Sequence, residues 1–247
     1  MIRIQDLYLN YPDGTCALKG VGLHISRGEF LLICGPNGSG KTTLLRTMSG
    51  LLKPSSGSIH INGLDPIRNS REIRMMMGIV FQDPDSQIVG ETVREDVAFG
   101  PENLGLSQTE IDDRVHWALQ KMDIENLVEK PCYLLSGGEK RRLAIAGVMA
   151  MKPQVILFDE PFANLDYQGI REILTFMIQW HQEGHTLIVT THDVEKASAH
   201  VDRIVVLQGG EIKISGNPED LFKELQRVGV RPPCHVLLGK EKLSWLE

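Results

Sequence analysis

The chain has 247 residues, of which 42% are hydrophobic and 23% charged, and its formal net charge is -6. This length allows one large or two small domains with a buried core. The acidic balance argues against a surface built mainly to bind nucleic acid and leaves room for a local basic patch. The four cysteines form no CxxC pair, which argues against a zinc site and favours a reducing compartment. The sequence has neither the apolar segment of a signal peptide nor an apolar run as long as a spanning helix, so we expect no membrane crossing.

The amino-terminal part of the chain is predicted to consist mainly of β-strands. Two stretches with alternating apolar and polar residues, 3–11 and 17–25, flank the turn sequence PDGT. A continuous apolar run follows at 28–34, and further short strands are expected at 57–63 and 76–82. The turn between the first two strands predicts an antiparallel unit at the start of the chain.

The middle of the chain is predicted to be loop and helix. Thr92 with Glu95, and Ser107 with Glu110, have the spacing of a capping box, in which each side chain accepts a hydrogen bond from the other residue's backbone. Both pairs therefore predict the start of a helix. A further helix is expected to begin at Ser136.

Strands return in the last third of the chain. Stretches rich in β-branched residues lie at 154–160, 186–193 and 203–212, and a helical stretch at 171–184 separates the first two. This alternation predicts a parallel sheet with crossover helices. The pair Asn217-Pro218 is expected to open a last helix, because proline is favoured at the first helical position.

We therefore predict an α/β fold with a mostly parallel sheet, an antiparallel amino-terminal β part and an inserted helical subdomain. The main domain is expected to span 1–217, with its core in 1–83 and 151–217 and the helical subdomain in 84–150. Residues 218–247 are expected to form a helical carboxy-terminal tail.

The sequence GPNGSGKTT carries the strongest chemical signal. It matches the phosphate-loop pattern G-x-x-x-x-G-K-[ST], follows an apolar strand and opens a helix. Glycines let the backbone N–H groups face phosphates, the lysine adds a charge on the outer phosphates, and the following hydroxyl suits Mg²⁺. The alternative, a glycine-rich turn with a chance lysine, explains this context poorly. The predicted nucleotide-binding residues are Gly35, Pro36, Asn37, Gly38, Ser39, Gly40, Lys41, Thr42 and Thr43.

Two carboxylates end the apolar strand VILFDE. Asp159 suits the coordination shell of Mg²⁺, and Glu160 suits a role in polarising a water molecule for attack on a γ-phosphate. In isolation, two solvated acids at a strand end would be the better interpretation. Downstream of a phosphate loop, the catalytic interpretation is preferred.

The sequence LSGGE offers a second candidate phosphate cradle. Ser136 and Glu139 fit a capping box, and in isolation that structural interpretation is sufficient. Capping does not require glycines at positions 137 and 138, which lower helix stability. Three cations at positions 140–142 also crowd a helix start, where the helix dipole disfavours positive charge, and a nearby polyphosphate would offset this.

LSGGE resembles the LSGGQ signature of the ABC ATPases, and the chain is similar to that family over residues 1 to about 217. The resemblance implies that ATP and Mg²⁺ are the ligands. It also implies that two chains pack head to tail, so that each ATP lies between one chain's phosphate loop and the partner's signature residues Ser136, Gly137, Gly138 and Glu139. Glu139 replaces the usual glutamine and adds a negative charge near that phosphate.

Other residues match motifs of the same family. The resemblance implies that Tyr11 lies against the adenine ring, that Gln82 contacts Mg²⁺ and the attacking water, and that His192 contacts the γ-phosphate. Thr42, Gln82 and Asp159 are the implied Mg²⁺ contacts, and Glu160, His192 and Gln82 the implied catalytic residues. Asp166 matches a position at the dimer seam.

A narrower resemblance concerns the segment 81–107, which looks like that of the energy-coupling factor ATPases of prokaryotic importers, the cobalt-type members above all. It implies a homodimer or a heterodimer with a second ABC ATPase, an integral membrane coupling subunit and a separate substrate-capture subunit. The chain would then lie peripherally on the cytoplasmic face of the membrane, without nucleic acid as a partner. The implied cargo is a metal ion such as cobalt or nickel, or a vitamin.

Two other functions are compatible with a phosphate loop. A soluble ABC-type ATPase acting on nucleic acid or the ribosome usually carries a coiled-coil insert or tandem ATPase domains, and the sequence has neither. A phosphate-loop kinase acting on a small molecule would leave LSGGE and His192 unexplained. The transport motor therefore remains the preferred hypothesis.

Overall fold

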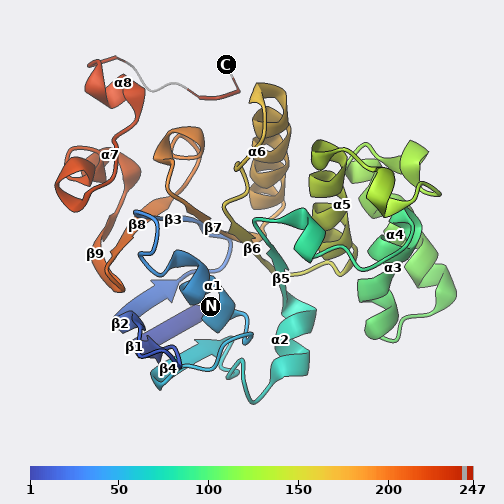
Figure 1. The fold of residues 1–247 in the computed structure, drawn as a ribbon, viewed down its shortest axis with the longest axis horizontal. Helices are drawn as coiled ribbons and strands as arrows, with labels where there is room; N and C mark the ends of the chain where they lie inside the picture. Colours follow the sequence, from blue (N-terminus) through green and yellow to red (C-terminus); the bar gives the residue numbers. More distant parts are fainter. Residues whose placement is uncertain (241–243, 247) are drawn as a thin grey trace.

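Two β-sheets organise the chain, one of three strands and one of six (Figure 1). The structure is a computed structural model that describes residues 1–240 and 244–246. The predicted α/β class is confirmed, with a mostly parallel main sheet and a separate antiparallel sheet near the amino terminus.

The three-stranded sheet has the order β2-β1-β4 and is antiparallel throughout. Its strands are β1 (Ile2–Asn10), β2 (Cys16–Ile25) and β4 (Ser56–Ile61). Ile2 pairs with Ile25 on one side and with Ile61 on the other, and all three are fully buried. Because side chains alternate along a strand, this register directs one apolar face of the sheet toward the core.

The six-stranded sheet has the order β5-β6-β7-β3-β8-β9. Its strands are β3 (Phe30–Cys34), β5 (Met77–Val80), β6 (Val155–Asp159), β7 (Thr186–Thr191), β8 (Arg203–Gln208) and β9 (Glu211–Gly216). All neighbours pair in parallel except β8 and β9. The carboxyl ends of β5, β6, β7 and β3 therefore meet at one edge, where open α/β sheets bind their ligands.

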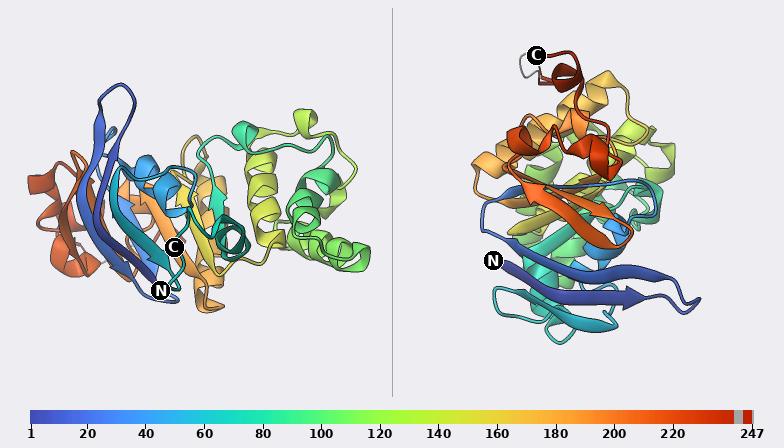
Figure 2. Two further views of the ribbon diagram at one scale, coloured as in Figure 1. Left: turned by 90° about the horizontal axis from the view of Figure 1, so that it is seen from below. Right: turned by 90° about the vertical axis from the view of Figure 1, so that its left-hand side faces the viewer.

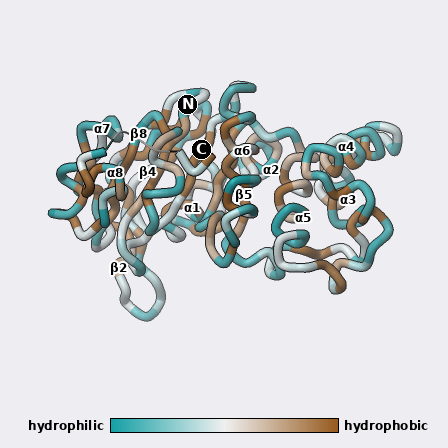
Figure 3. Tube along the Cα trace, turned by 90° about the horizontal axis from the view of Figure 1, so that it is seen from above, coloured by the Kyte–Doolittle hydropathy of each residue, from teal (hydrophilic) through white to brown (hydrophobic). Residues whose placement is uncertain are grey.

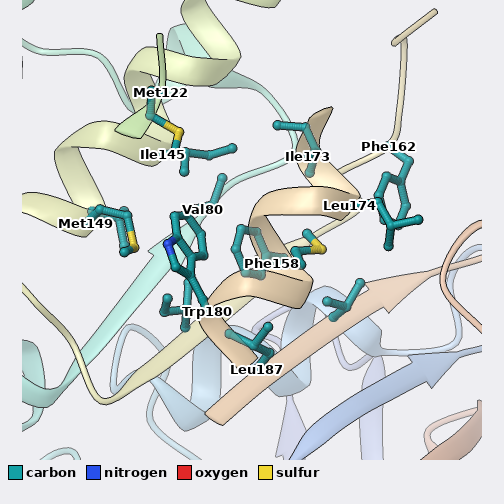
Figure 4. Packing of buried hydrophobic residues seen from close by; sticks show 14 of the residues in the cluster. Val80, Met122, Ile145, Met149, Phe158, Phe162, Ile173, Leu174, Trp180 and Leu187 are labelled. Atoms are coloured by element: carbon teal, nitrogen blue, oxygen red, sulfur yellow. The ribbon is translucent and has the colours of Figure 1, made fainter. Parts of the chain in front are cut away.

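Helices and the small sheet cover the two faces of the large sheet. The helices are α1 (Lys41–Met48), α2 (Ser70–Met76), α3 (Val93–Asn103), α4 (Gln108–Lys121), α5 (Gly137–Ala150), α6 (Tyr167–Gln182), α7 (Pro218–Leu221) and α8 (Cys234–Leu237). One apolar cluster joins α1 and the small sheet to one face of the large sheet. The other face packs against α6, where Trp180 stacks on Phe158 with ring centroids 6.2 Å apart (Figure 4).

Helices α3, α4 and α5 gather at one end of the molecule, away from the small sheet (Figure 2). They share an apolar cluster that includes Val97, Ile111 and Leu143. The capping boxes at Thr92, Ser107 and Ser136 are present, so these three helix starts are confirmed. We propose on this packing that the three helices form the helical subdomain.

Three details of the secondary structure differ from the sequence prediction. The single strand expected at 203–212 is a hairpin of β8 and β9, because Gly209 and Gly210 adopt positive φ angles of 59° and 85° and reverse the chain. Helix α2 was not predicted, since only Ile73 among its residues is buried and its sequence lacks a clear apolar stripe. The last helix, which Asn217 caps as expected, stops at Leu221 and is followed by a 3-10 helix at Leu225–Val228.

Hydrophobic residues follow the interior elements, such as β8 and α6, whereas the loop between β1 and β2 is hydrophilic to neutral (Figure 3). Among the helices of residues 1–240 and 244–246, none combines the length and the apolar character that a bilayer crossing requires.

Candidate active site

Four loops at the carboxyl edge of the large sheet surround a cavity of about 500 Å³. The loop after β3 leads into α1, Glu160 follows β6, His192 follows β7 and Gln82 follows β5. Most of the predicted site residues are brought together here, although they come from distant parts of the chain. The cavity is lined by Tyr11, Thr15, Cys16, Ala17, Lys19, Asn37, Gly38, Ser39, Gly40, Lys41, Thr42, Thr43, Gln82, Glu160, His192, Gly209 and Gly210.

Two glycines of the phosphate loop are required by close approach of the backbone. Gly35 has φ 151°, and a Cβ atom there would lie 2.0 Å from the carbonyl oxygen of Leu207. Gly40, which precedes α1, has φ 103°, and its Cβ would lie 2.6 Å from the carbonyl oxygen of Ala17. A side chain at either position would therefore displace the loop from its neighbours.

The start of α1 has the features of an anion site. No side chain caps its first turn, and the turn contains no acidic residue, so its backbone N–H groups are available. The Ser39 hydroxyl is buried, with 2% of the residue exposed, and has no hydrogen-bond partner. Buried polar atoms are normally satisfied, so this orphaned hydroxyl fits an oxygen of a bound phosphate.

Lys41 points back onto the loop that precedes it. Its Nζ donates to the carbonyl oxygens of Gly35 and Pro36, at 2.8 and 3.1 Å, and lies 3.9 Å from Oε1 of Glu160. Burial lowers the pKa of Lys41, while the nearby carboxylate of Glu160 opposes that shift. A phosphate in the cavity would replace carbonyl acceptors with a charged one and so strengthen the contact.

Thr42 and Asp159 form a pair of oxygen donors beside the loop. The Thr42 hydroxyl donates to Oδ1 of Asp159 at 3.0 Å, and the Thr190 hydroxyl donates to the same oxygen at 2.7 Å. Hydroxyl and carboxylate oxygens are ligands that Mg²⁺ accepts, usually with phosphate oxygens and waters completing its shell. Among the described residues, no group of three or more His, Cys, Asp or Glu side chains is placed to hold a metal ion.

Glu160 is held in an unusual position. Its backbone has a positive φ of 47°, a region that non-glycine residues rarely adopt and that often accompanies function. Nδ1 of His192 lies 3.0 Å from both carboxylate oxygens of Glu160. The Glu160 side chain is 10% exposed and the His192 side chain 57% exposed, and both line the cavity. This pair could orient a water molecule and sense a phosphate.

The far end of the cavity is formed by residues that the sequence prediction mostly missed. Tyr11 was expected there, and its hydroxyl hydrogen-bonds the Thr43 hydroxyl at 3.0 Å. Thr15, Cys16, Ala17, Lys19, Gly209 and Gly210 also line the cavity and were not predicted. They belong to turns and to the start of β2, and they carry no motif, so only the packing of the two sheets reveals them.

The second cradle lies at the start of α5, apart from the first cavity. Oγ of Ser136 accepts from the Glu139 N–H at 3.3 Å, and Oε2 of Glu139 accepts from the Ser136 N–H at 2.7 Å. The Ser136 backbone bond lowers the pKa of Glu139, and Lys130 contributes. Both hydrogen bonds of the capping box predicted for LSGGE are therefore formed within the chain.

Capping does not account for the two glycines. Gly137 and Gly138 are exposed, and a Cβ atom at either would meet no atom within 4 Å. Nothing in this chain therefore requires glycine there. Gly137 lines a neighbouring cavity that also contacts Thr42, Gln82 and Asp159, whereas Ser136, Gly138 and Glu139 line neither cavity.

The prediction that a nearby polyphosphate offsets the three positive charges at positions 140–142 is wrong. Lys140, Arg141 and Arg142 do not wait for a polyphosphate: Lys140 pairs with Asp85, and Arg142 donates to Glu172 at 2.8 Å. Arg141 donates to two backbone carbonyls of the segment after β5. All three side chains are bound by acceptors that are distant in sequence, which spacing alone could not show.

Asp166 lies outside the cavity as the exposed N-cap of α6. Its Oδ1 accepts from the Gly169 N–H at 2.8 Å. This bond stabilises the helix start and leaves the residue at the surface, near the end of the loop that follows Glu160.

The family follows from the comparison of the sequence with known proteins. Residues 18–163, more than half of the chain, match the family model described as ABC transporter. The chain is an ABC ATPase. It is therefore an enzyme that hydrolyses ATP to ADP and phosphate.

Relatives of this ABC ATPase are similar to it in sequence and in structure over most of its length. The energy-coupling factor transporter ATP-binding protein EcfA of Methanocaldococcus jannaschii is 42% identical over 232 residues, which cover 92% of this chain and 83% of that protein. The structure of cbiO1 from Clostridium perfringens, part of the ABC transporter complex cbiONQ, has a TM-score of 0.82 at 41% identity and covers 92% of this chain and 93% of its own. The resemblance to the energy-coupling factor ATPases is thus confirmed.

A bacterial ABC transporter cassette solved as a dimer is also similar, with a TM-score of 0.80 and 31% identity, over 88% of this chain and 99% of that one. The same cassette has a structure in a post-hydrolysis state with ADP and Pi, with a TM-score of 0.79. These matches establish the cassette fold of the ABC ATPase described here.

Proposed function

We propose that this ABC ATPase is the motor subunit of an energy-coupling factor importer that takes up a metal ion such as cobalt or nickel, or a vitamin. The observation that carries the proposal is the pair of separated phosphate cradles. The first adjoins Lys41, Glu160 and His192, whereas the second presents two glycines that this chain does not need. The similarity to EcfA supports the same class of transporter.

The two cradles are complementary halves of a site that two chains complete. In the proposed dimer, the exposed face of Gly137 and Gly138 meets the nucleotide bound at the partner's phosphate loop. The absence of side chains there lets backbone N–H groups approach the γ-phosphate closely. Asp166 would lie at the seam between the chains. A homodimer with two sites, or a heterodimer with a second ABC ATPase, satisfies this geometry.

Each residue around the phosphate loop, the first cradle, would have its own role in ATP hydrolysis. Lys41 and the N–H groups of α1 would bind the phosphates, and Tyr11 would pack against the adenine. Glu160 would accept a proton from the attacking water as the water oxygen bonds to the γ-phosphorus, while the bond from that phosphorus to the bridging oxygen breaks and ADP leaves. His192 would hold the carboxylate and the phosphate in place. Mg²⁺ held by Thr42, Asp159 and Gln82 would supply positive charge against the phosphate oxygens.

The transport step requires partners beyond the ATPase pair. An integral membrane coupling subunit would receive the closing motion, and a separate membrane subunit would capture the cargo. The chain would then lie peripherally on the cytoplasmic face of the membrane, and no nucleic acid would be involved. Closure on ATP and release after hydrolysis would drive the coupling subunit through its cycle.

The dimer is tested by light scattering on the Glu160→Gln protein with and without ATP and Mg²⁺. Because the amide cannot accept the proton, ATP should persist and a dimer should accumulate. Adding Gly138→Glu should abolish the dimer, since the new carboxylate would repel the phosphate while its place in the first helical turn suits the helix dipole. A dimer that forms equally well with Gly138→Glu would contradict the proposed sandwich.

The transport role is tested by co-expression with the membrane subunits of an energy-coupling factor importer. The wild-type chain should co-purify with them through detergent and support ATP-dependent uptake of radioactive cobalt or of a vitamin. The Lys41→Ala chain should co-purify but support no uptake. A chain that stays in the soluble fraction with full ATPase activity would instead favour the soluble ABC-type ATPase.

A further inference from the structure

Glu139 places a full negative charge on the first turn of the second cradle. It is the third residue of α5, and its carboxylate accepts the Ser136 N–H at 2.7 Å. That bond lowers the pKa of Glu139, so the carboxylate is ionised at neutral pH. The positive end of a helix is equivalent to only about half an elementary charge, which one carboxylate exceeds. Without compensation, the second cradle would therefore repel a phosphate.

A cation from a different segment meets this charge. Nζ of Lys130 donates to Oε2 of Glu139 at 3.3 Å and lies 3.4 Å from Oε1. Lys130 is the cationic partner that the ion pairs of the described residues give to Glu139. Lys140 and Arg142, which follow on α5, pair instead with acidic residues of other segments. The charge balance of the cradle therefore depends on Lys130.

The backbone around Lys130 is fixed on both sides. Its carbonyl oxygen accepts the Val93 N–H at 3.2 Å, at the start of α3, and its N–H donates to the carbonyl oxygen of Leu127 at 2.8 Å. Two residues later, the Cys132 N–H donates to the carbonyl oxygen of Glu91 at 2.9 Å. The helical segments beside α5 thus hold Lys130 where its side chain reaches Glu139.

Folding stability does not explain this ion pair. The Lys130 side chain is 33% exposed and the Glu139 side chain 21%, and partly exposed ion pairs contribute little to stability. Lys121 and Glu183 form a comparable pair, with Nζ and Oε1 3.6 Å apart and the lysine side chain 31% exposed. Neither of these two residues lines the nucleotide cavity or the cavity at Gly137. The second pair therefore provides a matched control.

We infer that Lys130 is a positioning residue of the second cradle, which neutralises Glu139 and holds its carboxylate at the cap, so that Gly137 and Gly138 meet the partner's γ-phosphate without repulsion. The inference rests on the proposed function, because only a dimer gives this cradle a ligand. Lys130 and Glu139 together then take the place of one neutral glutamine in the signature. Since each dimer contains two cradles, the loss of Lys130 acts twice in a homodimer.

The test is a charge cycle in the Glu160→Gln background, where light scattering over a range of protein concentrations gives the Kd of the dimer with ATP and Mg²⁺. Lys130→Met should weaken this dimer about 10-fold or more, because the uncompensated carboxylates face phosphates. Adding Glu139→Gln should restore the Kd to within about twofold, since glutamine keeps the cap and carries no charge. The control Lys121→Met should change the Kd by less than about twofold.

Three further measurements separate charge from structure. Lys130→Arg keeps the positive charge and should dimerise like the Glu160→Gln reference. The loss caused by Lys130→Met should shrink at high salt, which screens the repulsion. With Glu160 restored, Lys130→Met should lower kcat while the monomer binds a fluorescent ATP analogue as before, because that nucleotide lies at the first cradle. The unfolding temperatures of Lys130→Met and Lys121→Met should agree.

The inference is overturned if Lys130→Met dimerises as tightly as the reference, or if Glu139→Gln does not restore the dimer. An unfolding temperature of Lys130→Met far below that of Lys121→Met, without rescue by Glu139→Gln, would assign Lys130 to the folding of the helices alone. A Glu160→Gln protein that forms no dimer with ATP would contradict the proposed function and remove the basis of the inference with it. The reference protein therefore tells failure of the dimer apart from failure of the role of Lys130.

Discussion

Nδ1 of His192 lies 3.0 Å from both carboxylate oxygens of Glu160, although 32 residues separate them in sequence. The same carboxylate lies 3.9 Å from Nζ of Lys41. The carboxylate of Glu160 therefore contacts both Lys41, which is expected to bind phosphate, and His192, which is expected to contact the γ-phosphate. A γ-phosphate entering the cavity would compete with Glu160 for Lys41, and this competition would leave the carboxylate to His192 and water.

Replacement of His192 by alanine is expected to lower kcat by about 10²-fold with little change in KM, because the carboxylate would lose its orienting partner while the phosphate loop stays intact. Steady-state phosphate release, together with equilibrium binding of ATP, measures both parameters. The histidine is mostly exposed, so the unfolding temperature should not change. A rise in KM alone would show that His192 contributes to binding and not to the chemical step.

Replacement of Thr42 by valine is expected to raise the Mg²⁺ concentration for half-maximal activity by roughly 10- to 100-fold. Valine keeps the shape of the side chain but removes the hydroxyl that donates to Asp159. Thr42→Ser, which keeps the hydroxyl, is the matched control and should behave as the wild type. If the valine and serine variants require the same Mg²⁺ concentration, the Thr42 hydroxyl does not contribute to Mg²⁺ binding.

Alanine at Gly138 is expected to separate stability from activity. Since a Cβ there meets nothing within 4 Å, the variant should unfold at the same or a higher temperature, with a gain of up to about 0.5–1 kcal/mol. ATP hydrolysis should nevertheless fall by about 10²-fold, because the methyl group would occupy the space of the partner's phosphate.

Gly147→Ala is the control for that experiment, because Gly147 lies on the same helix and its Cβ would make only an ordinary contact at 3.8 Å with Asp96. It should gain similar stability and keep its ATPase activity. An active Gly138→Ala protein would contradict the role of the second cradle. Calorimetry measures the unfolding temperatures of the two variants, and a phosphate-release assay measures their ATPase rates.

Replacement of Asp96 by asparagine is expected to stabilise the protein at neutral pH. Burial raises the pKa of Asp96 above 3.8, while its Oδ1 accepts the N–H groups of Val89 and Gly90. The folded state therefore binds more protons than the unfolded state between pH 3.8 and the raised pKa, so stability falls as the pH rises through that window. At neutral pH the full cost of the buried charge is present.

An asparagine oxygen could accept both N–H groups without a charge, so Asp96→Asn should gain ~1 kcal/mol, or about 2–4 °C in Tm. The gain should shrink as the pH falls toward 3.8, where the native aspartic acid is itself neutral. Asp96→Ala should instead lose about 1–3 kcal/mol, because both N–H groups would be left unpaired. Thermal unfolding across pH checks both, and a gain that does not depend on pH would contradict the assignment.

The sequence was sufficient where structure is encoded locally. The strand preceding Gly35 and the capping residue Ser136 combine periodicity with residues that have specific roles in turns and helix starts. The class of fold then followed from the alternation of elements, whereas the order of the strands was not predicted and comes from the structure. The phosphate loop was recognisable for the same reason, because its glycines and lysine are contiguous.

The features that the sequence did not predict depend on contacts between atoms that are distant in the chain. The acceptors of Arg141 are the carbonyl oxygens of Phe81 and Gln82, and every residue has a carbonyl, so no pattern announces them. The glycine turn between β8 and β9 was not recognised, because it lies within a stretch rich in β-branched residues that was predicted to be one strand. Lys19 and Cys16 reach the cavity only because the small sheet packs beside the large one.

The order of strands in the large sheet sets the scale of the catalytic site. Gln82, Glu160, His192 and Lys41 follow β5, β6, β7 and β3, which are four consecutive strands. Neighbouring strands lie about 4.8 Å apart, so the ends of these four strands span an edge of about 14 Å. The side chains that follow them converge across that edge, and Lys41 reaches to within 3.9 Å of Glu160. Main-chain pairing therefore sets where each loop begins, and the loops and side chains set the distances between the groups. A one-residue insertion within β6 would turn the carboxylates away from that edge, and no change of side chain elsewhere could return them.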